Sequence, residues 1–406
     1  MHMIPVAEAI ARITGAFDPL AAETVSLAEA CGRVLAEDVV ARTTQPPFDV
    51  SAMDGYAVRA DDLNTVPAVL NQIGAVPAGQ HFDGAVGAGE TVRIFTGSRM
   101  PKGADTVVIQ ENTTTENNRI TILKAPEKGQ FIRPSGLDFR TGEVGLKAGQ
   151  LLTPRAIGYA ASMNHPWLSV RRKPRVAILA TGDEIVLPGD PIGADQIVSS
   201  NSHALAAAVR SYGGEPFSLG IAPDERQGLK SMAAGARGAD ILVTTGGASV
   251  GDHDLVQSVL GEIGLELDFW KIAMRPGKPL IFGRIGDTRL LGLPGNPVSA
   301  LVCALIFLRP AIFRMLGLTE AGAATLAARI DCSLTANDER QDYLRATLQR
   351  TDNGALGVSP FKRQDSSMIS LLANSEALIV RPPFDPPVVE GDMVTIIPLA
   401  SGFPEI

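Results

Sequence analysis

The sequence predicts a multi-domain α/β plus β protein, with a central α/β domain that has a parallel-type sheet, an inserted β-rich domain and a small C-terminal β domain. The length of 406 residues corresponds to several domains. Apolar strands alternate with helices from Arg175 to about Gly317, which is typical of a parallel sheet that binds ligands at the carboxyl ends of its strands. Short β-type runs separated by Gly, Pro and Asn lie on both sides of this region.

The order of the elements indicates a discontinuous N-terminal domain. The chain starts with apolar residues at helical spacing, namely Ile4, Ala7, Ile10 and Ile13. Three β-type runs follow at 91–95, 106–110 and 119–123, and an apolar helical stretch returns at 156–163. The β-rich part is therefore interpreted as an insertion. The expected domains are 1–45 with 141–173, then 46–140, 174–317 and 318–406.

The later elements follow the same logic. In the α/β region VAILATG, ADILVTTGG and TRLLGLPGNP are predicted strands that run into glycine-rich turns, and SHALAAAVRSYG and DLVQSVLGEIG are predicted helices. After about Gly317 the β-type runs return, with a hairpin expected around Asp352-Asn353-Gly354 and a final strand at 393–397.

Composition excludes several classes of protein. The net charge is −8 and the 36 Lys and Arg are dispersed, so we expect no nucleic-acid partner, and an anionic ligand must meet local positive charge. Cys31, Cys303 and Cys332 are far apart, which disfavours disulfides and thiolate zinc and fits the reducing cytoplasm. No signal-peptide pattern opens the chain, and the apolar stretch 298–308 is about half the length of a membrane span. We expect a cytoplasmic protein without a membrane segment.

The stretch TTGGASVGDHD, residues 244–254, lies between a predicted buried strand and a helix. Its glycines, Gly246, Gly247 and Gly251, allow a ligand to approach the backbone, and Ser249 adds a hydroxyl. Unpaired N–H groups at a helix start bind phosphate or another oxyanion. The alternative is a tight turn whose acids complement the helix dipole.

The same residues match the G-x-S-x-G pattern of a serine hydrolase. In that fold the chain order is Ser, acid and then His, and His253 is the one histidine that follows Ser249. A separation of four residues is too short for the usual base, so a hydrolase is disfavoured.

Carboxylates are predicted to gather at one sheet edge. Asp183 and Glu184 end the first strand of the α/β domain, and Asp224 and Asp254 follow later strands. Carboxylate oxygens with few His or Cys nearby favour Mg²⁺ over zinc, so Glu184, Asp224 and Asp254 are candidate metal ligands. The alternative for each acid is a solvated turn or a helix cap.

Two further segments carry candidate ligand contacts. Arg275 and Lys278 flank a Pro-Gly turn, which supplies local positive charge or is an ordinary surface turn. In LPGNP, Asn296 is expected to cap a helix that begins at Pro297. The alternative is that this segment has a purely structural role. In the β-rich region, residues 47–57 and 96–105 are expected to be ordered loops that place an acid and hydroxyls for binding a small ion.

Taken together and in order, several motifs resemble the MoeA family, with the related gephyrin E domain sharing them. The motifs are SLAEACGRVLAEDVVA, SAMDGYAVR, TGSRMPKGADTVV, ATGDEIV, TTGGASVGDHD, PGKP and LPGNPVSA. The resemblance implies a four-domain, elongated homodimer with an active cleft shared between subunits. It implies a transferase that takes adenylated molybdopterin (adenylyl-molybdopterin) and molybdate, releases AMP and leaves molybdenum on the dithiolene, assisted by Mg²⁺.

The resemblance also implies the site residues. Motif positions assign catalytic roles to Asp54, Thr96, Glu184 and Asp254, and substrate contacts to Lys278, Pro294 and Pro297, with Arg275, Arg345 and Ser366. Arg275 stands where the family often has Lys, which adds a planar fork able to grip two oxygens. Ser199 stands where the family often has Asp, so one possible carboxylate is missing.

Two other functions remain open at this point. One is a gephyrin-like scaffold that binds a partner peptide, and the other is a molybdopterin adenylyltransferase that shares the α/β domain. As partners of the transferase, we expect molybdopterin adenylyltransferase and proteins that mature molybdoenzymes.

Overall fold

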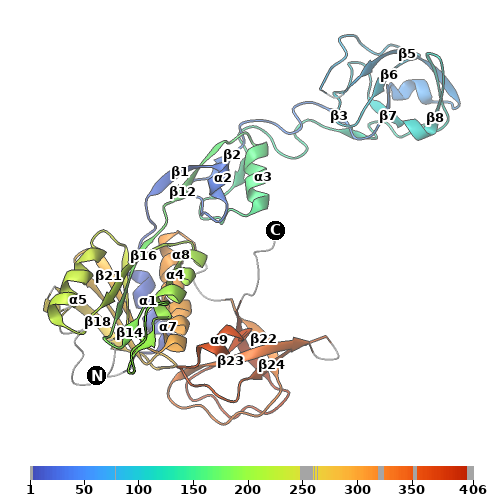
Figure 1. Ribbon diagram of the computed structural model, residues 1–406. Coiled ribbons are helices and arrows are strands. Elements are labelled where there is room, and N and C mark those ends of the chain that lie inside the picture. Colours follow the sequence, from blue (N-terminus) through green and yellow to red (C-terminus); the bar gives the residue numbers. More distant parts are fainter. Residues whose placement is uncertain are drawn as a thin grey trace.

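The computed structural model describes residues 3–77, 79–246, 259, 261, 262, 264–318, 324–350 and 354–399. The molecule is elongated (Figure 1). A β-rich domain occupies one end, a small domain that the chain crosses twice forms the middle, and the α/β domain lies beside the C-terminal β domain at the other end. This arrangement confirms the predicted fold class.

The α/β domain contains a six-stranded sheet with the order β16-β13-β17-β21-β20-β18. Four neighbouring strands are parallel: β16 (Glu215–Ala222), β13 (Arg175–Thr181), β17 (Ile241–Thr245) and β21 (Thr288–Leu293). Strand β20 (Pro279–Ile285) runs antiparallel to both of its neighbours, β21 and the edge strand β18 (Leu265–Lys271), so the sheet is mixed rather than wholly parallel. The reason is local, because Gly286 and Asp287 are too few residues to cross over between β20 and β21.

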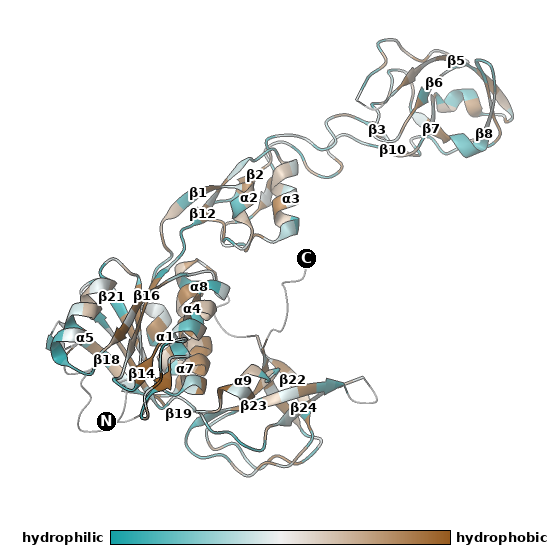
Figure 2. Cartoon of the chain, in the orientation of Figure 1, coloured by the Kyte–Doolittle hydropathy of each residue, from teal (hydrophilic) through white to brown (hydrophobic). Residues whose placement is uncertain are grey.

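Helices cover both faces of this sheet (Figure 1). One face carries α5 (Arg226–Ala233), and the other carries α4 (Asn201–Ser211), α7 (Pro297–Cys303) and α8 (Arg309–Met315). A π-helical segment, Ala304–Leu308, joins α7 to α8. The combined helix, Pro297–Met315, is long and apolar enough to cross a membrane, with a mean hydropathy of 1.8 over its most apolar 18-residue window, but 72% of that window is buried inside the molecule. Its hydrophobic residues therefore form core (Figure 2).

The N-terminal helix α1 (Val6–Gly15) packs in the α/β domain, although its place in the sequence assigned it to the N-terminal domain. Val6, Ala9 and Ile13 are buried in the same hydrophobic cluster as α8. An amphipathic helix must bury its apolar stripe, and the large α/β core offers the surface. The packing thus differs from the expected boundary of 1–45.

The middle domain is built from two separate passages of the chain. From the first come β1 (Ala22–Ser26), α2 (Leu27–Ala30) and β2 (Val39–Val40). From the second come β11 (Val144–Leu146), α3 (Pro154–Ser162) and β12 (Trp167–Arg171). Antiparallel pairing of β1 with β12 and of β2 with β11 joins the two passages. The hydroxyl of Thr153 caps α3 by accepting from the Ala156 N–H at 3.3 Å.

The β-rich domain holds a six-stranded sheet with the order β7-β4-β6-β5-β9-β8. Its strands are β4 (Gly55–Val58), β5 (Ala68–Val76), β6 (Glu90–Ile94), β7 (Thr106–Ile109), β8 (Thr113–Glu116) and β9 (Arg119–Ile122). The short pair β3 (Val50–Ser51) and β10 (Ile132–Arg133) lies where the chain enters and leaves the domain. The two short helices are η1 (Ala60–Leu63) and η2 (Gln110–Asn112).

The C-terminal domain has a six-stranded sheet with the order β19-β23-β24-β22-β26-β25, and β25 also pairs with β23. Its strands are β19 (Met274–Arg275), β22 (Leu326–Ile330), β23 (Gln341–Arg350), β24 (Leu356–Pro360), β25 (Ala377–Arg381) and β26 (Met393–Pro398). The antiparallel pairing of β23 with β24 confirms the predicted hairpin, although its turn residues 351–353 lie outside the described residues. Strand β19 belongs to this sheet although it lies within the sequence of the α/β domain.

Candidate active site

A cavity of about 610 Å³ lies at the carboxyl edge of the α/β sheet. It is lined from the α/β domain by Glu184, Gly246, Pro294 and Pro297, all of which the sequence nominated. Ser367 and Ile369 line it from the C-terminal domain. Open α/β sheets bind their ligands at this edge, so the fold and the cavity indicate the same place.

Gly246 lets the backbone that ends β17 lie close to the backbone of Thr181 at the base of this cavity. Its φ is +93°, and a Cβ there would lie 2.5 Å from the carbonyl oxygen of Thr181. The hydroxyl of Thr181 is buried and has no hydrogen-bond partner. Asn201 holds the edge together, because its Nδ2 donates to Thr245 Oγ1 at 2.8 Å and to the Gly295 carbonyl at 2.7 Å.

The acids of the site lie on two adjacent loops. The backbone N–H of Asp224, which follows β16, donates to Asp183 Oδ1 at 3.0 Å, so the loops after β13 and β16 are joined. Glu184, which follows Asp183 in the sequence, lines the cavity. Within the described residues no three His, Cys, Asp or Glu side chains form a preassembled metal cluster. The oxygen donors present are nevertheless those that Mg²⁺ prefers.

Four nominated residues, Gly247, Ser249, Gly251 and Asp254, lie outside the described residues. Their assignment to an oxyanion loop and to the metal site stays a prediction. The described Gly246, immediately before them, lies at the cavity.

The C-terminal domain closes the cavity through Ser366. Asn296 Nδ2 donates to Ser366 Oγ at 2.9 Å, and the backbone N–H of Val298 donates to the Ser366 carbonyl at 3.1 Å. Asn296 is indeed the N-cap residue of α7, with Pro297 as the first helical residue, but its side chain makes no capping bond to the helix. Its amide instead contacts the neighbouring domain.

Arg345 is a fully buried cation on β23. Its backbone is tied to Gln364, because the Arg345 N–H donates to Gln364 Oε1 at 2.9 Å and Gln364 Nε2 donates to the Arg345 carbonyl at 3.0 Å. Its three guanidinium nitrogens have no hydrogen-bond partner. Burial lowers the pKa of Arg345 from its ordinary value, and nearby Asp365 opposes that shift. An unpaired buried guanidinium provides strong donors for an anion.

The two cations of the Pro-Gly turn differ in their surroundings. Lys278 is exposed immediately before Pro279, a residue that lines the cavity. The guanidinium of Arg275 instead contacts acceptors of the C-terminal domain, among them Asp338 at 3.2 Å and Asp342. Its planar fork does grip two carboxylates, and both belong to the protein.

A second group of nominated residues, Asp54 and Thr96, lies in the β-rich domain. The backbone N–H and the hydroxyl of Thr96 both donate to Asp54 Oδ1 at 2.8 Å. These bonds, from the N–H first and then the hydroxyl, lower the pKa of Asp54 below its ordinary value, with a smaller effect of Arg93 in the same direction. Asp54 is therefore a carboxylate near neutral pH.

Arg93 is a neighbour of this pair that the sequence did not reveal. Its guanidinium carbon lies 4.9 Å from the ring centroid of Tyr56 and 5.2 Å from that of Phe95, and Nη2 donates to Gln110 Oε1 at 2.5 Å. Phe95 is two residues from Arg93, the spacing of neighbours on one face of a strand, but Tyr56 lies on β4, so sequence spacing gives no signal for its contact with Arg93.

The two groups of nominated residues are far apart. Asp54 and Thr96 belong to the domain at one end of the elongated molecule, and the cavity lies at the other end (Figure 1). One copy of the chain therefore does not bring the two groups together.

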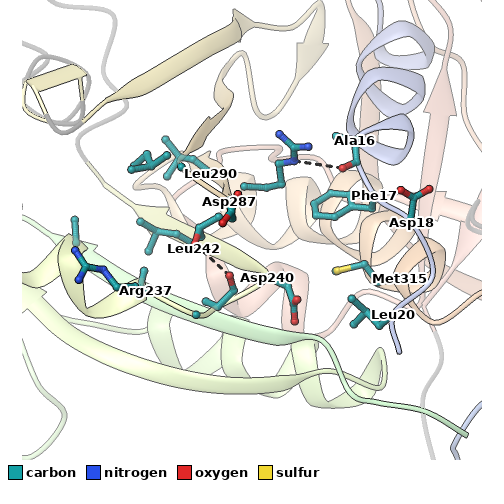
Figure 3. Close-up of a pocket in the computed structure, with 18 of the residues that line it drawn as sticks. Ala16, Phe17, Asp18, Leu20, Arg237, Asp240, Leu242, Asp287, Leu290 and Met315 are labelled. Atoms are coloured by element: carbon teal, nitrogen blue, oxygen red, sulfur yellow. Dashed lines mark hydrogen bonds between the residues drawn. The ribbon is translucent and has the colours of Figure 1, made fainter. Parts of the chain in front are cut away.

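Cavity size alone does not identify the site. A larger cavity of about 1100 Å³ lies at the opposite edge of the sheet, before β17 and β21. Phe17, Leu20, Leu242, Leu290 and Met315 give it largely apolar walls (Figure 3). Asp240 at its edge is already paired with Arg172 at 2.7 Å. None of the nominated residues lines it.

Family models match nearly the whole chain. The MoeA N-terminal region (domain I and II) matches residues 4–164, the probable molybdopterin binding domain matches 177–314, and the MoeA C-terminal region (domain IV) matches 327–399. A molybdopterin molybdenumtransferase from Nostoc sp. is 36% identical over 93% of this chain and 88% of the relative. One from Haemophilus influenzae is 35% identical over 94% of each chain.

A solved structure shows the same architecture. The MoeA molybdopterin biosynthesis protein from Pyrococcus horikoshii superposes with a TM-score of 0.84 at 29% identity, over 98% of this chain and 100% of that one. Fold, motif order and the matching relatives agree, and the chain belongs to the MoeA family.

Proposed function

We propose that this chain is a molybdopterin molybdenumtransferase, which inserts molybdenum from molybdate into adenylated molybdopterin and releases AMP. The observation that carries the proposal is the cavity between the α/β and C-terminal domains. There the glycine backbone at Gly246, the carboxylate of Glu184 and the loop of the C-terminal domain that holds Ser367 lie around one space. Such a cavity has the chemistry for a ligand that combines phosphate groups with an organic ring. The curated relatives that match most of this chain carry the same activity in their names.

In this proposal the α/β domain binds the phosphate part of the substrate. Gly246 lets the backbone approach the ligand, and the unpartnered Thr181 hydroxyl beside it is a free donor. Asn201 fixes the loops that end β17 and β21 relative to each other. The site is thus preorganised, which lowers the cost of ordering it when the substrate binds.

Cationic groups offset the negative charge of phosphate and molybdate. Lys278 lies next to the cavity-lining Pro279, and Arg345 offers three unpaired guanidinium nitrogens on the C-terminal side. Donors that are already fixed in place stabilise charge that develops in the transition state without reorganising. Ser366 and Ser367 add hydroxyls at the same boundary.

Mg²⁺ fits the donor set of the carboxylate edge. Glu184, Asp224 and Asp254 would hold the ion, since hard oxygen ligands suit it and the loops of Asp183 and Asp224 are already joined. When bound, the ion supplies Lewis-acid polarisation of phosphate oxygens. Position 199 holds a buried serine in place of an aspartate. The remaining acids would therefore have to bind the ion without a carboxylate at that position.

We further propose that the working unit is a homodimer in which each site combines the cavity of one subunit with Asp54 and Thr96 of the other. The separation of these groups within one chain supports this assembly. A carboxylate whose pKa is lowered, as for Asp54, stays ionised and is suited to contact a cation or a cationic part of the ligand once the two halves meet.

The test is release of AMP from adenylated molybdopterin by the purified protein. AMP should appear when molybdate and a divalent cation are both present, and a chelator should abolish it. Full turnover in chelator would remove the cation from the proposal. Adenylyl transfer from ATP to molybdopterin in place of AMP release would identify an adenylyltransferase, and the absence of both reactions would favour a scaffold.

A further inference from the structure

The segment Arg275-Pro276-Gly277-Lys278 passes from one domain's sheet to the other's. Strand β19 pairs in parallel with β23 of the C-terminal domain, with Met274 opposite Gln341 and Arg275 opposite Asp342. Strand β20, which begins at Pro279, belongs to the sheet of the α/β domain. Three residues therefore separate the two sheets. Any shift of the C-terminal domain acts directly on this connection.

The guanidinium of Arg275 is directed at the C-terminal domain. Nη1 donates to Asp338 Oδ2 at 3.2 Å, and Nη2 donates to Asn337 Oδ1 at 3.3 Å and to Asp342 Oδ2. Asp342 is the buried partner, since its side chain is 6% exposed, whereas that of Arg275 is 47% exposed. A planar fork can satisfy separate acceptors at once, but a lysine ammonium is a single compact charge.

The strand held by this fork carries a substrate-site candidate. Arg345 follows Asp342 by three residues on β23. The backbone of Arg345 is bonded to Gln364, whose loop also presents Ser366 to Asn296. Fixing Asp342 thus fixes the strand and, through Gln364, the loop that closes the cavity.

We propose that Arg275 is a positioning residue that clamps the C-terminal domain and thereby places Arg345 and Ser366, and that it does not itself contact substrate. This inference rests on the proposed function and reverses the substrate contact expected for Arg275 from the sequence. The ammonium of Lys278, three residues later, has no hydrogen-bond or ion-pair partner among the described residues, although the Lys278 carbonyl accepts from the Ile272 N–H at 3.0 Å. This side chain is exposed beside the cavity-lining Pro279 and is free to meet a ligand.

A double-mutant cycle separates a clamp from a substrate contact. When Asp342 is intact, Arg275→Met should lower kcat/KM by about tenfold or more. In the Asp342→Asn variant the same change should lower it by less than about threefold, because the carboxylate that Arg275 binds is already lost. Arg275→Lys should recover less than half of that loss, because it keeps the charge and not the fork. An equal factor for Arg275→Met in both backgrounds would show a direct substrate contact and overturn the clamp.

Hydrogen exchange gives a readout that does not depend on turnover. Backbone amides of β23 should exchange faster in Arg275→Met and in Arg275→Lys, and Lys278→Ala is the matched control that should leave them unchanged. Unchanged exchange in the Arg275 variants overturns the clamp whatever the activity, and faster exchange with unaltered kcat/KM overturns its positioning role. If the unaltered protein lacks turnover, the proposed function fails, and the positioning role fails with it, whereas the exchange result still decides the contact between the domains. The double variant Arg275→Met with Asp342→Asn guards against misfolding, because it leaves no unpaired buried carboxylate.

Discussion

The β-rich end of the molecule and the cavity end contribute different chemistry. The β-rich end offers an exposed carboxylate, Asp54, held by two bonds from Thr96. The cavity end offers close backbone at Gly246, the acid Glu184 and the buried cation Arg345. The cavity at the second end is walled by two domains, and Asp54 lines neither this cavity nor the apolar one at the opposite sheet edge.

The difference shows that binding and the contribution of Asp54 are separable in this chain. Residues of the cavity end should control substrate affinity, because they surround the ligand. Asp54 should control turnover, because in the proposed homodimer it joins the site from the other subunit. A substitution at one end should therefore leave the property that the other end controls unchanged.

The largest effect is expected for Asp54→Ala. Loss of a fixed charge that stabilises the transition state lowers kcat by about 10²- to 10³-fold, while substrate affinity should stay within about threefold because the cavity is untouched. Steady-state kinetics and a direct binding measurement check both halves of this statement. Asp62→Ala is the matched control, since that carboxylate also accepts a backbone N–H, from Gly89 at 3.0 Å, elsewhere in the same domain. If Asp54→Ala weakens substrate binding and leaves kcat unaltered, Asp54 contributes to binding and not to turnover.

A smaller effect is expected at the cavity end for Asn201→Ala. This change removes the bonds to Thr245 and Gly295, and each hydrogen bond contributes about 0.5–1.5 kcal/mol, so KM should rise by about tenfold with kcat little changed. Asn64→Ala removes a bond of 2.8 Å to the Asp61 carbonyl in the β-rich domain and should leave KM as it is. If the two asparagine variants behave alike, the cavity edge is not preorganised by Asn201.

The smallest effect concerns Asp338 and appears only in acid. Bonds from Arg340 first, with Arg275 adding to them, lower the pKa of Asp338 from 3.8 to about 2. A lowered folded-state pKa contributes stability that is present above pH 3.8 and is lost as the pH falls through about 2. Asp338→Asn should therefore flatten the acid dependence of the unfolding free energy in this window. An unchanged acid slope in the variant would show that the shift of Asp338 does not stabilise the fold.

The sequence predicted local elements well, because their signals are local. The buried run at 106–109, the strand before Gly182 and the start of α7 at Pro297 all follow from spacing and turn residues. The partner of an element is a different matter. Helical spacing at the N-terminus identified the helix, but it placed the exposed Ala7 on the apolar stripe, and it did not identify the domain against which α1 packs. Composition likewise did not reveal that β20 runs antiparallel to its neighbours β18 and β21.

For the site, motif positions identified the residues and the structure supplied their partners. Glu184, Gly246, Pro294 and Pro297 meet in one cavity, as sheet topology requires of strand ends. Asn296 has the sequence of a cap, yet its amide contacts Ser366, which lies 70 residues later. The acceptors of Arg275 lie 63 and 67 residues away, a separation at which no sequence spacing encodes contact. Long-range pairs such as these require the tertiary structure.

The central claim is that a complete site takes one half from each of two subunits, and mixed dimers of Asp54→Ala with Glu184→Ala test it most directly. In a twofold dimer each subunit contributes to both sites, so one site of the mixed dimer carries both changes and the other carries neither. With free subunit exchange about half of the dimers are mixed, and AMP release should recover to roughly a quarter of the unaltered rate. If exchange is verified and the mixture releases AMP no faster than the average of the two variants, both acids serve the same subunit's site and the shared-site account is contradicted.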